Sequence, residues 1–336
     1  MVASATRGTE DMAGLWQRQS IYALSGLVLF FLIAAFDYRF YENLHRLLYI
    51  VIVVLLVALL ALGEMSSGVQ RWIVANAIQP SELAKVVVII GLAKLLADHD
   101  GEMGRIRHLL LSLGYVLAPV ALIYLQPNLS TAITIGLIWL VMVVMAGARL
   151  LHLGLLALGA ILVSPLFWLT LKDYMRNRIL LFLDPAGNPD TFYNVQQALI
   201  SIGSGGWLGK GFGSGTQSQL RFLRVRHTDY IFSVIGEELG LLGAIVLLSL
   251  FAFLIWRILR VAGMSKDPFG RLICIGVAAI IFLQTAVNIG VNLGLLPVTG
   301  LPLPFVSYGG SSLWMFLIAL GLVESIAMRH KKLDFE

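Results

Sequence analysis

The sequence predicts an all-α membrane protein that crosses the bilayer several times. Of its 336 residues, 58% are hydrophobic and only 13% are charged, whereas soluble domains carry about 25% charged residues. Apolar runs long enough to cross about 30 Å of hydrocarbon follow one another along the chain. The single cysteine, Cys274, lies within such a run, which excludes a disulfide framework and a cysteine-based metal site. We therefore expect one polytopic membrane domain spanning residues 1–336.

Nine segments are predicted to be transmembrane helices, and together they account for most of the chain. They cover residues 20–36, 44–63, 80–97, 107–125, 129–147, 150–172, 229–257, 268–294 and 306–328. Residues 1–17 lack the apolar core and the cleavage site of a signal peptide, so we expect a polar N-terminal tail. Residues 173–228 are predicted to form one large loop.

The orientation follows from the short loops, because Lys and Arg concentrate in short loops on the cytoplasmic side. The cations of the short loops and of the C-terminal tail are Arg105, Arg149, Arg260, Lys266, Arg329, Lys331 and Lys332. With nine helices, all of them fall on one side of the membrane. We therefore expect a cytoplasmic C-terminus and an extracytoplasmic location for the loop 173–228.

The large loop is cationic. Between Lys172 and Thr228, seven Lys and Arg residues stand against three Asp residues, which gives a net charge of +4. This charge indicates an anionic partner at the outer face, either a substrate or lipid headgroups.

Asp229 follows this loop directly, at the predicted start of the next helix. A charged side chain beside a bilayer is costly unless it pairs, faces a cavity or takes part in chemistry. Because Arg224, Arg226 and His227 precede it and a helix N-terminus adjoins it, we expect its ionised form to be favoured. The same cations could hold Asp229 in a structural ion pair, so the residues alone leave both interpretations open.

The loop contains a glycine-rich stretch, GSGGWLGKGFGSG, at residues 203–215. A phosphate-binding loop needs G-x-x-x-x-G-K followed by Ser or Thr. Here Ser204 stands where the first glycine belongs, and Gly211 follows Lys210, so nucleotide binding is excluded. The glycines could present backbone N–H groups to another anion, or they could serve as hinges or close-packing positions.

A second polar group lies at residues 70–85, with the sequence QRWIVANAIQPSELAK. Pro80 suits the first position of a helix, and Glu82 falls in the first turn, where the helix dipole favours an anion. Glu82 and Lys85 share a helix face at i, i+3. These residues predict either a capped helix start with an internal ion pair, or a site where Lys85 and Arg71 bind phosphate.

A third polar group lies near the C-terminus. Gln284, Asn288 and Asn292 recur every four residues, and such a stripe either connects helices or lines a cavity. The following segment, 295–312, is rich in Pro and Gly. Non-helical backbone at membrane depth is tolerated only where it packs in protein or lines water. We therefore expect a re-entrant or cavity-facing segment, with Ser307 and Tyr308 as polar contacts.

The helix after Asp229 combines small and acidic residues. Gly236 and Gly240 have the spacing that allows another helix to approach closely. Glu237 and Glu238 lie deep enough in this helix to require partners. For both glutamates we expect structural pairing.

Five stretches of the chain resemble the SEDS family, named for shape, elongation, division and sporulation. They are RWI…QPSELAK at 71–85, FLDP at 182–185, GSGGWLGKGFGSGTQSQL at 203–220, HTDYIF…GEELG at 227–240 and NIGVNLGLLPVTGLPLPFVSYGGSS at 288–312. The resemblance covers nearly the whole chain. GTQSQL and GLLPVTGLPLPF are more similar to the elongation branch, RodA, than to the division branch, FtsW.

The resemblance implies a peptidoglycan glycosyltransferase that polymerises lipid II, with inversion at the sugar, at the outer face of the bacterial inner membrane during cell elongation. Asp229 corresponds to the family's essential acid, and we assign it as the general base that deprotonates the acceptor hydroxyl. The family's required charges map onto Arg71, Glu82 and Lys85. We assign stabilisation of the diphosphate and other substrate contacts to Arg71, Glu82, Lys85, Lys210, Arg221, His227 and Ser307.

The resemblance also implies partners and raises the question of a metal. The expected partners are a class B penicillin-binding protein, which supplies the transpeptidase, and other membrane proteins of the elongation complex. The diphosphate could recruit Mg²⁺ or Mn²⁺, but the sequence shows no ligand set, because the six histidines lack ligand spacing. No feature indicates a nucleic-acid partner.

The chain departs from the family pattern at two places. The stretch QPNLSTA has Asn128 where the family has Asp in QPDLGTA, so a role of that aspartate does not carry over. The family has ten helices with both termini inside, and the nine predicted here align with its second to tenth. We expect the first helix to be absent, which places the N-terminus outside if Met1 is the true start.

Two functions of other classes remain as alternatives. A lipid II flippase would also need a polar cavity and cations, but the predicted site is concentrated on one face and no repeat relates the two halves. A non-catalytic scaffold for a penicillin-binding protein would keep the packing glycines and tolerate the loss of Asp229. Labelled lipid II added to the purified protein distinguishes glycan synthesis, translocation and neither.

Overall fold

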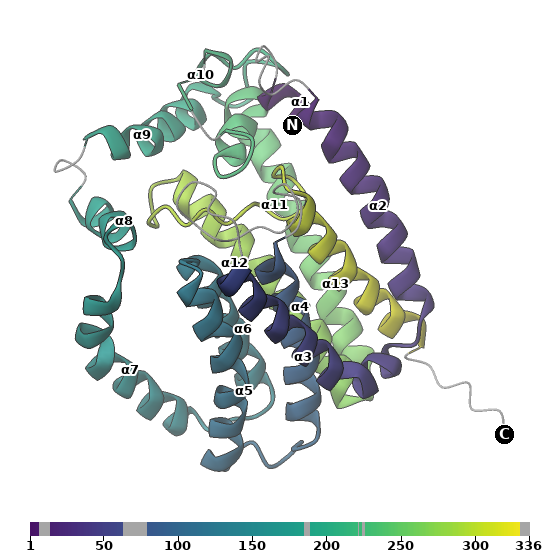
Figure 1. Cartoon of the computed structure of the whole chain (residues 1–336). Coiled ribbons are helices and arrows are strands. Elements are labelled where there is room, and N and C mark those ends of the chain that lie inside the picture. Colours follow the sequence, from purple (N-terminus) through teal and green to yellow (C-terminus); the bar gives the residue numbers. More distant parts are fainter. Residues whose placement is uncertain (7–13, 63–78, 185–188, 221, 224–225, 330–336) are drawn as a thin grey trace. The chain divides into compact units, whose positions relative to one another are not determined.

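The computed structural model describes residues 1–6, 14–62, 79–184, 189–220, 222–223 and 226–329, and all regular elements in these ranges are α-helices (Figure 1). In chain order they are α1 (Val2–Ala5), α2 (Leu15–Ala35), α3 (Tyr38–Leu62), α4 (Pro80–Ala97), α5 (Ile106–Leu125), α6 (Leu129–Met145), α7 (Leu150–Thr170), α8 (Asp173–Leu183), α9 (Pro189–Ser204), α10 (Thr216–Gln219), α11 (Ile231–Met264), α12 (Pro268–Asn292) and α13 (Gly310–Arg329). The predicted all-α class is confirmed.

Seven of the described helices are long and apolar enough to cross a membrane: α2, α3, α5, α7, α11, α12 and α13. Two further helices match predicted spans but depart from the simple pattern. Helix α6 is apolar but has only 17 residues. Helix α4 carries Glu82, Lys85 and Lys94 within 18 residues. A helix for each of the nine predicted segments is therefore present among the described residues, as expected of a polytopic membrane protein.

The helix boundaries differ from the prediction where polar residues continue a helix beyond its apolar run. Helix α3 begins at Tyr38 instead of residue 44, and α11 continues to Met264 instead of residue 257. Backbone hydrogen bonding does not stop where hydropathy falls, so a hydropathy pattern shortens such helices. For the same reason α2 begins at Leu15, within the predicted tail, and the predicted loop 173–228 contains α8, α9 and α10.

The chain divides into two compact units. The first unit comprises Met1–Leu24, Lys172–Leu254 and Phe282–Leu313, and the second comprises Ser25–Leu171, Ile255–Ile281 and Trp314–Glu336. Four of the five boundaries fall inside α2, α11, α12 and α13, and the fifth separates α7 from α8. The first unit therefore contains the large loop, the start of α11 and the non-helical segment before α13.

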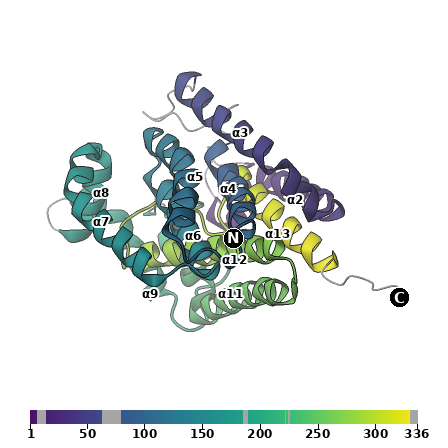
Figure 2. The same cartoon turned by 90° about the horizontal axis from the view of Figure 1, so that it is seen from below.

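The second unit is a helix bundle built around α4. Helix α3 packs against α4 and α5, and α4 packs against α5 and α6 (Figure 2). The core side chains of α4 and α6 include Ile89, Leu92 and Ile135, which are almost completely buried. Tyr49 of α3 stacks on Tyr115 of α5 with ring centroids 4.2 Å apart. Helix α7 has no buried residue.

The first unit has its own small core beside the turn that precedes α11. Ala198 of α9, Leu223, Tyr230 and Val291 of α12 are buried together. Burial of these side chains joins the large loop, the turn and α12 in one packed cluster, since apolar area removed from water stabilises the contact by about 25 cal/mol per Å².

Candidate active site

Asp229 lies in the turn 226–230, which immediately precedes α11. The helix begins at Ile231, two residues after the predicted start. Asp229 therefore lies outside the hydrogen-bonded backbone of α11. Its position depends on the hydrogen bonds that other segments make with the turn.

Two asparagine side chains of α12 hold the turn. The Nδ2 atoms of Asn288 and Asn292 both donate to the main-chain carbonyl of Asp229, at 3.1 and 2.9 Å. The Oδ1 atom of Asn292 accepts from the N–H and the hydroxyl of Ser233, at 3.1 and 2.6 Å. The polar stripe thus connects α12 to the start of α11. Its third residue, Gln284, is fully buried, and its amide atoms contact no hydrogen-bond partner among the described residues.

The non-helical segment between α12 and α13 closes the turn from another direction. The Ser307 hydroxyl donates to the carbonyl of Thr228 at 2.6 Å and accepts from the N–H of Leu303 at 2.9 Å. The N–H of Tyr308 donates to the carbonyl of His227 at 2.9 Å. The predicted polar contact of Ser307 is confirmed, and this irregular backbone is tolerated because its polar groups bond within the protein.

The electrostatics of Asp229 differ from the expectation. Burial raises the pKa of the Asp229 carboxyl, and the charge of Arg178 and a hydrogen bond with the Thr228 side chain oppose this shift only in part. The expectation that its ionised form is favoured was therefore wrong. Loss of hydration around a buried carboxylate outweighs one nearby cation.

The described basic residues just before Asp229, Arg226 and His227, do not supply a positive charge to its carboxylate. Arg226 is buried, and its Nε donates to the carbonyl of Ala5. Burial and the charge of Arg226 lower the pKa of His227, so this imidazole is neutral near pH 7. Arg224 lies outside the described residues. Among the described residues, the cation whose charge acts on Asp229 is Arg178 of α8, which is distant in sequence.

The glycine-rich stretch packs against α11 at a break in that helix. Gly240 has φ +66° and ψ −164°, which is not helical. The amides of Lys210 and Gly211 donate to the carbonyls of Glu237 and Glu238, at 2.9 and 3.0 Å, and those of Leu241 and Leu242 donate to Gly206 and Trp207. A Cβ on Gly209 would lie 2.2 Å from the Glu238 carbonyl oxygen. Of the three roles left open, the structure supports close packing, because the amides of Lys210 and Gly211 are bonded to protein.

The two glutamates of α11 have partners, as expected. The buried Glu237 carboxylate accepts from Lys210 Nζ at 3.0 Å, from the Thr216 hydroxyl at 3.3 Å and from the N–H of Gln217 at 2.8 Å. Glu238 accepts from the hydroxyl of Ser4. Gly236 packs against Ile202 of α9, where a Cβ would lie 3.1 Å from the Ile202 side chain. Close helix approach at Gly236 is thus confirmed.

The second unit contains the other predicted polar group. Lys85 Nζ donates to Glu82 Oε1 at 2.7 Å, and both side chains are almost completely buried. Asn128 caps α6 by accepting from the N–H of Thr131 at 3.4 Å, and its Nδ2 donates to the Ser81 hydroxyl at 3.3 Å. Pro80 occupies the first helical turn as predicted. The ion pair exists, and Asn128 fixes the start of the helix that carries it.

The structure therefore groups the predicted site residues into three sets. Asp229, His227 and Ser307 meet at the turn before α11. Lys210 lies in the same unit and is bonded to Glu237, while Glu82 and Lys85 form their pair in the second unit. Arg71 and Arg221 lie outside the described residues.

Arg178 of α8, one of the seven cations of the large loop, was not predicted as a neighbour of Asp229. Its Nη1 donates to the carbonyl of Thr299 at 3.3 Å, and its guanidinium lies 5.8 Å from the Tyr174 ring centre. Arg178 and Phe182 are separated by four residues, so they share one face of α8. A helical pattern within the predicted loop was the signal that could have identified this face.

Within the described ranges, no three His, Cys, Asp or Glu side chains gather closely enough to hold a metal ion.

Comparison with known proteins places this geometry in context. A family model described as Cell cycle protein, FtsW/RodA/SpoVE, matches residues 1–332. The chain is 39% identical over 327 residues to peptidoglycan glycosyltransferase MrdB of Escherichia coli K12, which covers 96% of this chain and 88% of that protein.

Solved structures agree with this result. A chain from a study of polymerisation and crosslinking by a peptidoglycan synthase complex has a TM-score of 0.82 at 33% identity, covering 98% of this chain and 96% of that one. The rod shape determining protein RodA of Thermus thermophilus has a TM-score of 0.71 at 31% identity, covering 98% and 92%.

Proposed function

Because the chain belongs to the SEDS family of FtsW, RodA and SpoVE and is a membrane-embedded peptidoglycan glycosyltransferase, we propose that Asp229 is its general base. The acceptor is a sugar hydroxyl, and the donor is the lipid-linked disaccharide of lipid II. A positioned base contributes about 10²–10⁴ to the rate of such a transfer.

One observation carries the assignment of Asp229. Both asparagines of α12 bond its main-chain carbonyl, so they anchor the turn without using the carboxylate, which itself has a hydrogen bond with the Thr228 side chain. The main-chain carbonyl thus fixes the position of Asp229, while its carboxylate can accept a proton. A structural ion pair would use the carboxylate for anchoring.

The chemistry requires a proton acceptor and a group that stabilises the leaving diphosphate. Ionised Asp229 would accept the proton of the acceptor hydroxyl as the oxygen attacks the anomeric carbon of the donor, and the diphosphate departs with the bonding electron pair. Neutral His227, next to Asp229, can donate a hydrogen bond to substrate. Ser307 keeps Thr228, and thereby Asp229, in place.

The remaining charged residues are proposed to bind the lipid-linked diphosphate. Arg71, Lys85 and Arg221 would supply positive charge, with Glu82 orienting Lys85 through their hydrogen bond. Lys210 would act while bonded to Glu237, since an ammonium has three donors. Charge-assisted hydrogen bonds to phosphate are roughly twice as strong as neutral ones.

Purified protein supplied with labelled lipid II tests the proposed function. We expect glycan chains on gels. Movement of lipid II across vesicle membranes without glycan chains would identify a flippase instead, and the absence of both, with intact binding of a penicillin-binding protein, would identify a scaffold.

The pH dependence of polymerisation follows from the burial of Asp229. A base must be ionised, and its pKa is raised from the ordinary value of 3.8, so activity is present above the raised pKa and is lost as pH falls through it. We expect initial rates to decline at a pH clearly above that at which an exposed aspartate protonates. Rates measured in buffers of constant ionic strength, with folding checked at each pH, provide the test. A flat profile down to about pH 4 would contradict the base assignment.

The location and partner are proposed on coarser grounds. The chain is a multi-pass membrane protein, and we propose that it resides in the bacterial inner membrane with its C-terminus in the cytoplasm, because its short loops are basic on one side. We also propose a class B penicillin-binding protein as partner, since the matched solved chain comes from a peptidoglycan synthase complex. Labelling of cysteines introduced near Arg329 from each side of the membrane checks the orientation.

A further inference from the structure

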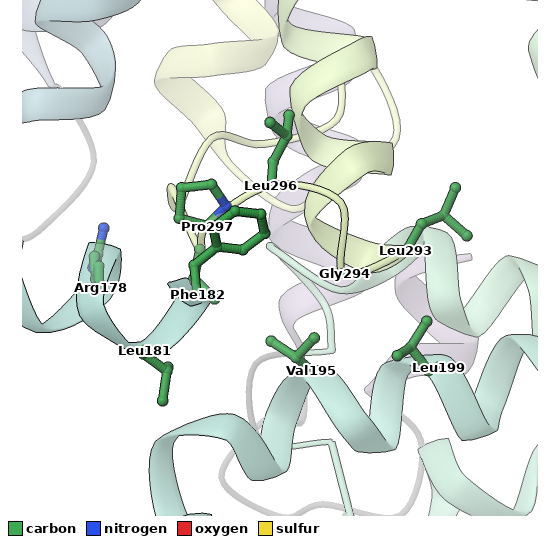
Figure 3. Close-up of a pocket in the computed structure, with 10 residues that line it drawn as sticks. Arg178, Leu181, Phe182, Val195, Leu199, Leu293, Gly294, Leu296 and Pro297 are labelled. Atoms are coloured by element: carbon green, nitrogen blue, oxygen red, sulfur yellow. The ribbon is translucent and has the colours of Figure 1, made fainter. Parts of the chain in front are cut away.

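A pocket of about 170 Å³ lies in the first unit, between α8, α9 and the segment that follows α12 (Figure 3). Its lining is apolar except for one charged side chain, Arg178. The apolar part includes Leu181, Phe182, Val195, Leu199, Leu296 and Pro297. Phe182 and Leu199 are each 40% exposed, so a ligand can reach the pocket from outside.

The charged end of this pocket adjoins the Asp229 carboxylate. Arg178 Nη1 donates to the Thr299 carbonyl at 3.3 Å. The next residue, Gly300, has φ +72°, and a Cβ built on it would lie 3.7 Å from Asp229 Oδ2. Neighbouring residues of one loop therefore contact Arg178 and Asp229.

The size and the chemistry of the pocket define its ligand. An apolar cavity of about 150 Å³ stays dry and holds a benzene ring, so a pocket of similar volume fits one five-carbon isoprene unit. A guanidinium matches phosphate oxygens with two parallel hydrogen bonds. An amphiphile with an isoprenoid stem and a phosphate head satisfies both ends.

We infer that this pocket binds the isoprene unit next to the diphosphate of a polyprenyl-linked substrate, and that Arg178 contacts the diphosphate. The inference rests on the proposed function and adds to it a lipid subsite and a binding residue. It places the leaving group beside Asp229, where the acceptor hydroxyl is deprotonated. A lipid headgroup with its acyl chain has the same two chemical parts, so the test must distinguish the two ligands.

Cysteine protection provides a direct test, because the native Cys274 is buried. Leu199→Cys is introduced into Asp229→Asn protein in phosphatidylcholine nanodiscs, and maleimide labelling is followed with and without geranyl diphosphate. We expect geranyl diphosphate to slow labelling at least about tenfold. One additional apolar group in a hydrophobic pocket strengthens binding by about 10–200-fold. Ile200→Cys is the matched control, since Ile200 is equally exposed on α9 but does not line the pocket.

Three further measurements decide the assignment. Arg178→Gln should abolish protection, Arg178→Lys should retain part of it, and inorganic diphosphate alone should give none. Equal protection at both cysteines, or protection by phosphatidylglycerol nanodiscs without the probe, would overturn the inference. In otherwise native protein, Leu199→Trp should raise KM for lipid II at least about tenfold with kcat little changed, while Ile200→Trp should change neither.

The protection experiment tests the pocket independently of the proposed role of Asp229 as general base. Protection is measured in Asp229→Asn protein, where no turnover is required. If polymerisation survives in Asp229→Asn while protection persists, the base assignment fails and the pocket stands. If turnover depends on Asp229 but Leu199→Cys is not protected, the pocket assignment fails alone.

Discussion

Asp229→Asn is expected to insert and fold normally and to make no detectable glycan. Asparagine keeps the shape of the side chain but cannot accept the proton of the acceptor hydroxyl, and loss of a general base costs about 10²–10⁴ in rate. Folding should persist because Asn288 and Asn292 bond the main-chain carbonyl of residue 229, which the substitution leaves in place. Gel analysis of labelled lipid II products gives the rate.

The half-buried Asp229 carboxyl has a raised pKa because of desolvation, so loss of its charge should not destabilise the fold. The matched control is Asp173→Asn, which alters an exposed acid at the start of α8, in the large loop that precedes Asp229. It should polymerise at the wild-type rate. Polymerisation by Asp229→Asn at close to that rate would end the base assignment.

Lys85→Ala is expected to abolish polymerisation and to lower thermal stability. Lys85 Nζ donates to Glu82 Oε1 at 2.7 Å, and the two side chains are only 0% and 5% exposed. Removing one partner of a buried ion pair leaves an uncompensated charge and costs about 3–5 kcal/mol. Heating in detergent followed by size-exclusion chromatography measures the stability.

The double variant Glu82→Gln, Lys85→Met separates the two roles of this pair. It removes both charges, so stability should return to near that of the wild type. If Lys85 contacts the diphosphate, polymerisation should remain absent. Recovery of polymerisation together with stability would show that the pair serves only to hold α4.

The sequence predicted the helices well because each is encoded locally by an apolar run. Its errors lie where the helix and the apolar run do not coincide, as at Tyr38 and Met264. The break at Gly240 could not be predicted, because it depends on a loop 30 residues earlier whose backbone bonds both sides of the break. Long-range pairing of this kind leaves no periodic pattern.

The polar residues around the turn before α11 could be recognised from the sequence, but the charges around Asp229 could not. Asp229, Ser307 and the asparagine stripe were recognised as polar residues in apolar surroundings, which is a local signal. Of the cations expected beside Asp229, Arg226 bonds the carbonyl of Ala5 instead, while Arg178, 51 residues before Asp229, acts on its carboxyl. Charge neighbours depend on tertiary packing, and sequence adjacency does not reveal them.

The turn that carries Asp229 is fastened by residues that are synthesised long after it. Asn288 and Asn292 lie 59 and 63 residues further along the chain, and Ser307 bonds Thr228 across 79 residues. A ribosome adds about 5–20 residues per second, so the last of these contacts becomes available roughly 4–16 s after the turn itself has been made. During biogenesis the chain therefore passes through a stage in which the carboxylate is present but unpositioned. A chain cut short before residue 288 would therefore carry Asp229 without the asparagine and serine contacts that hold its turn.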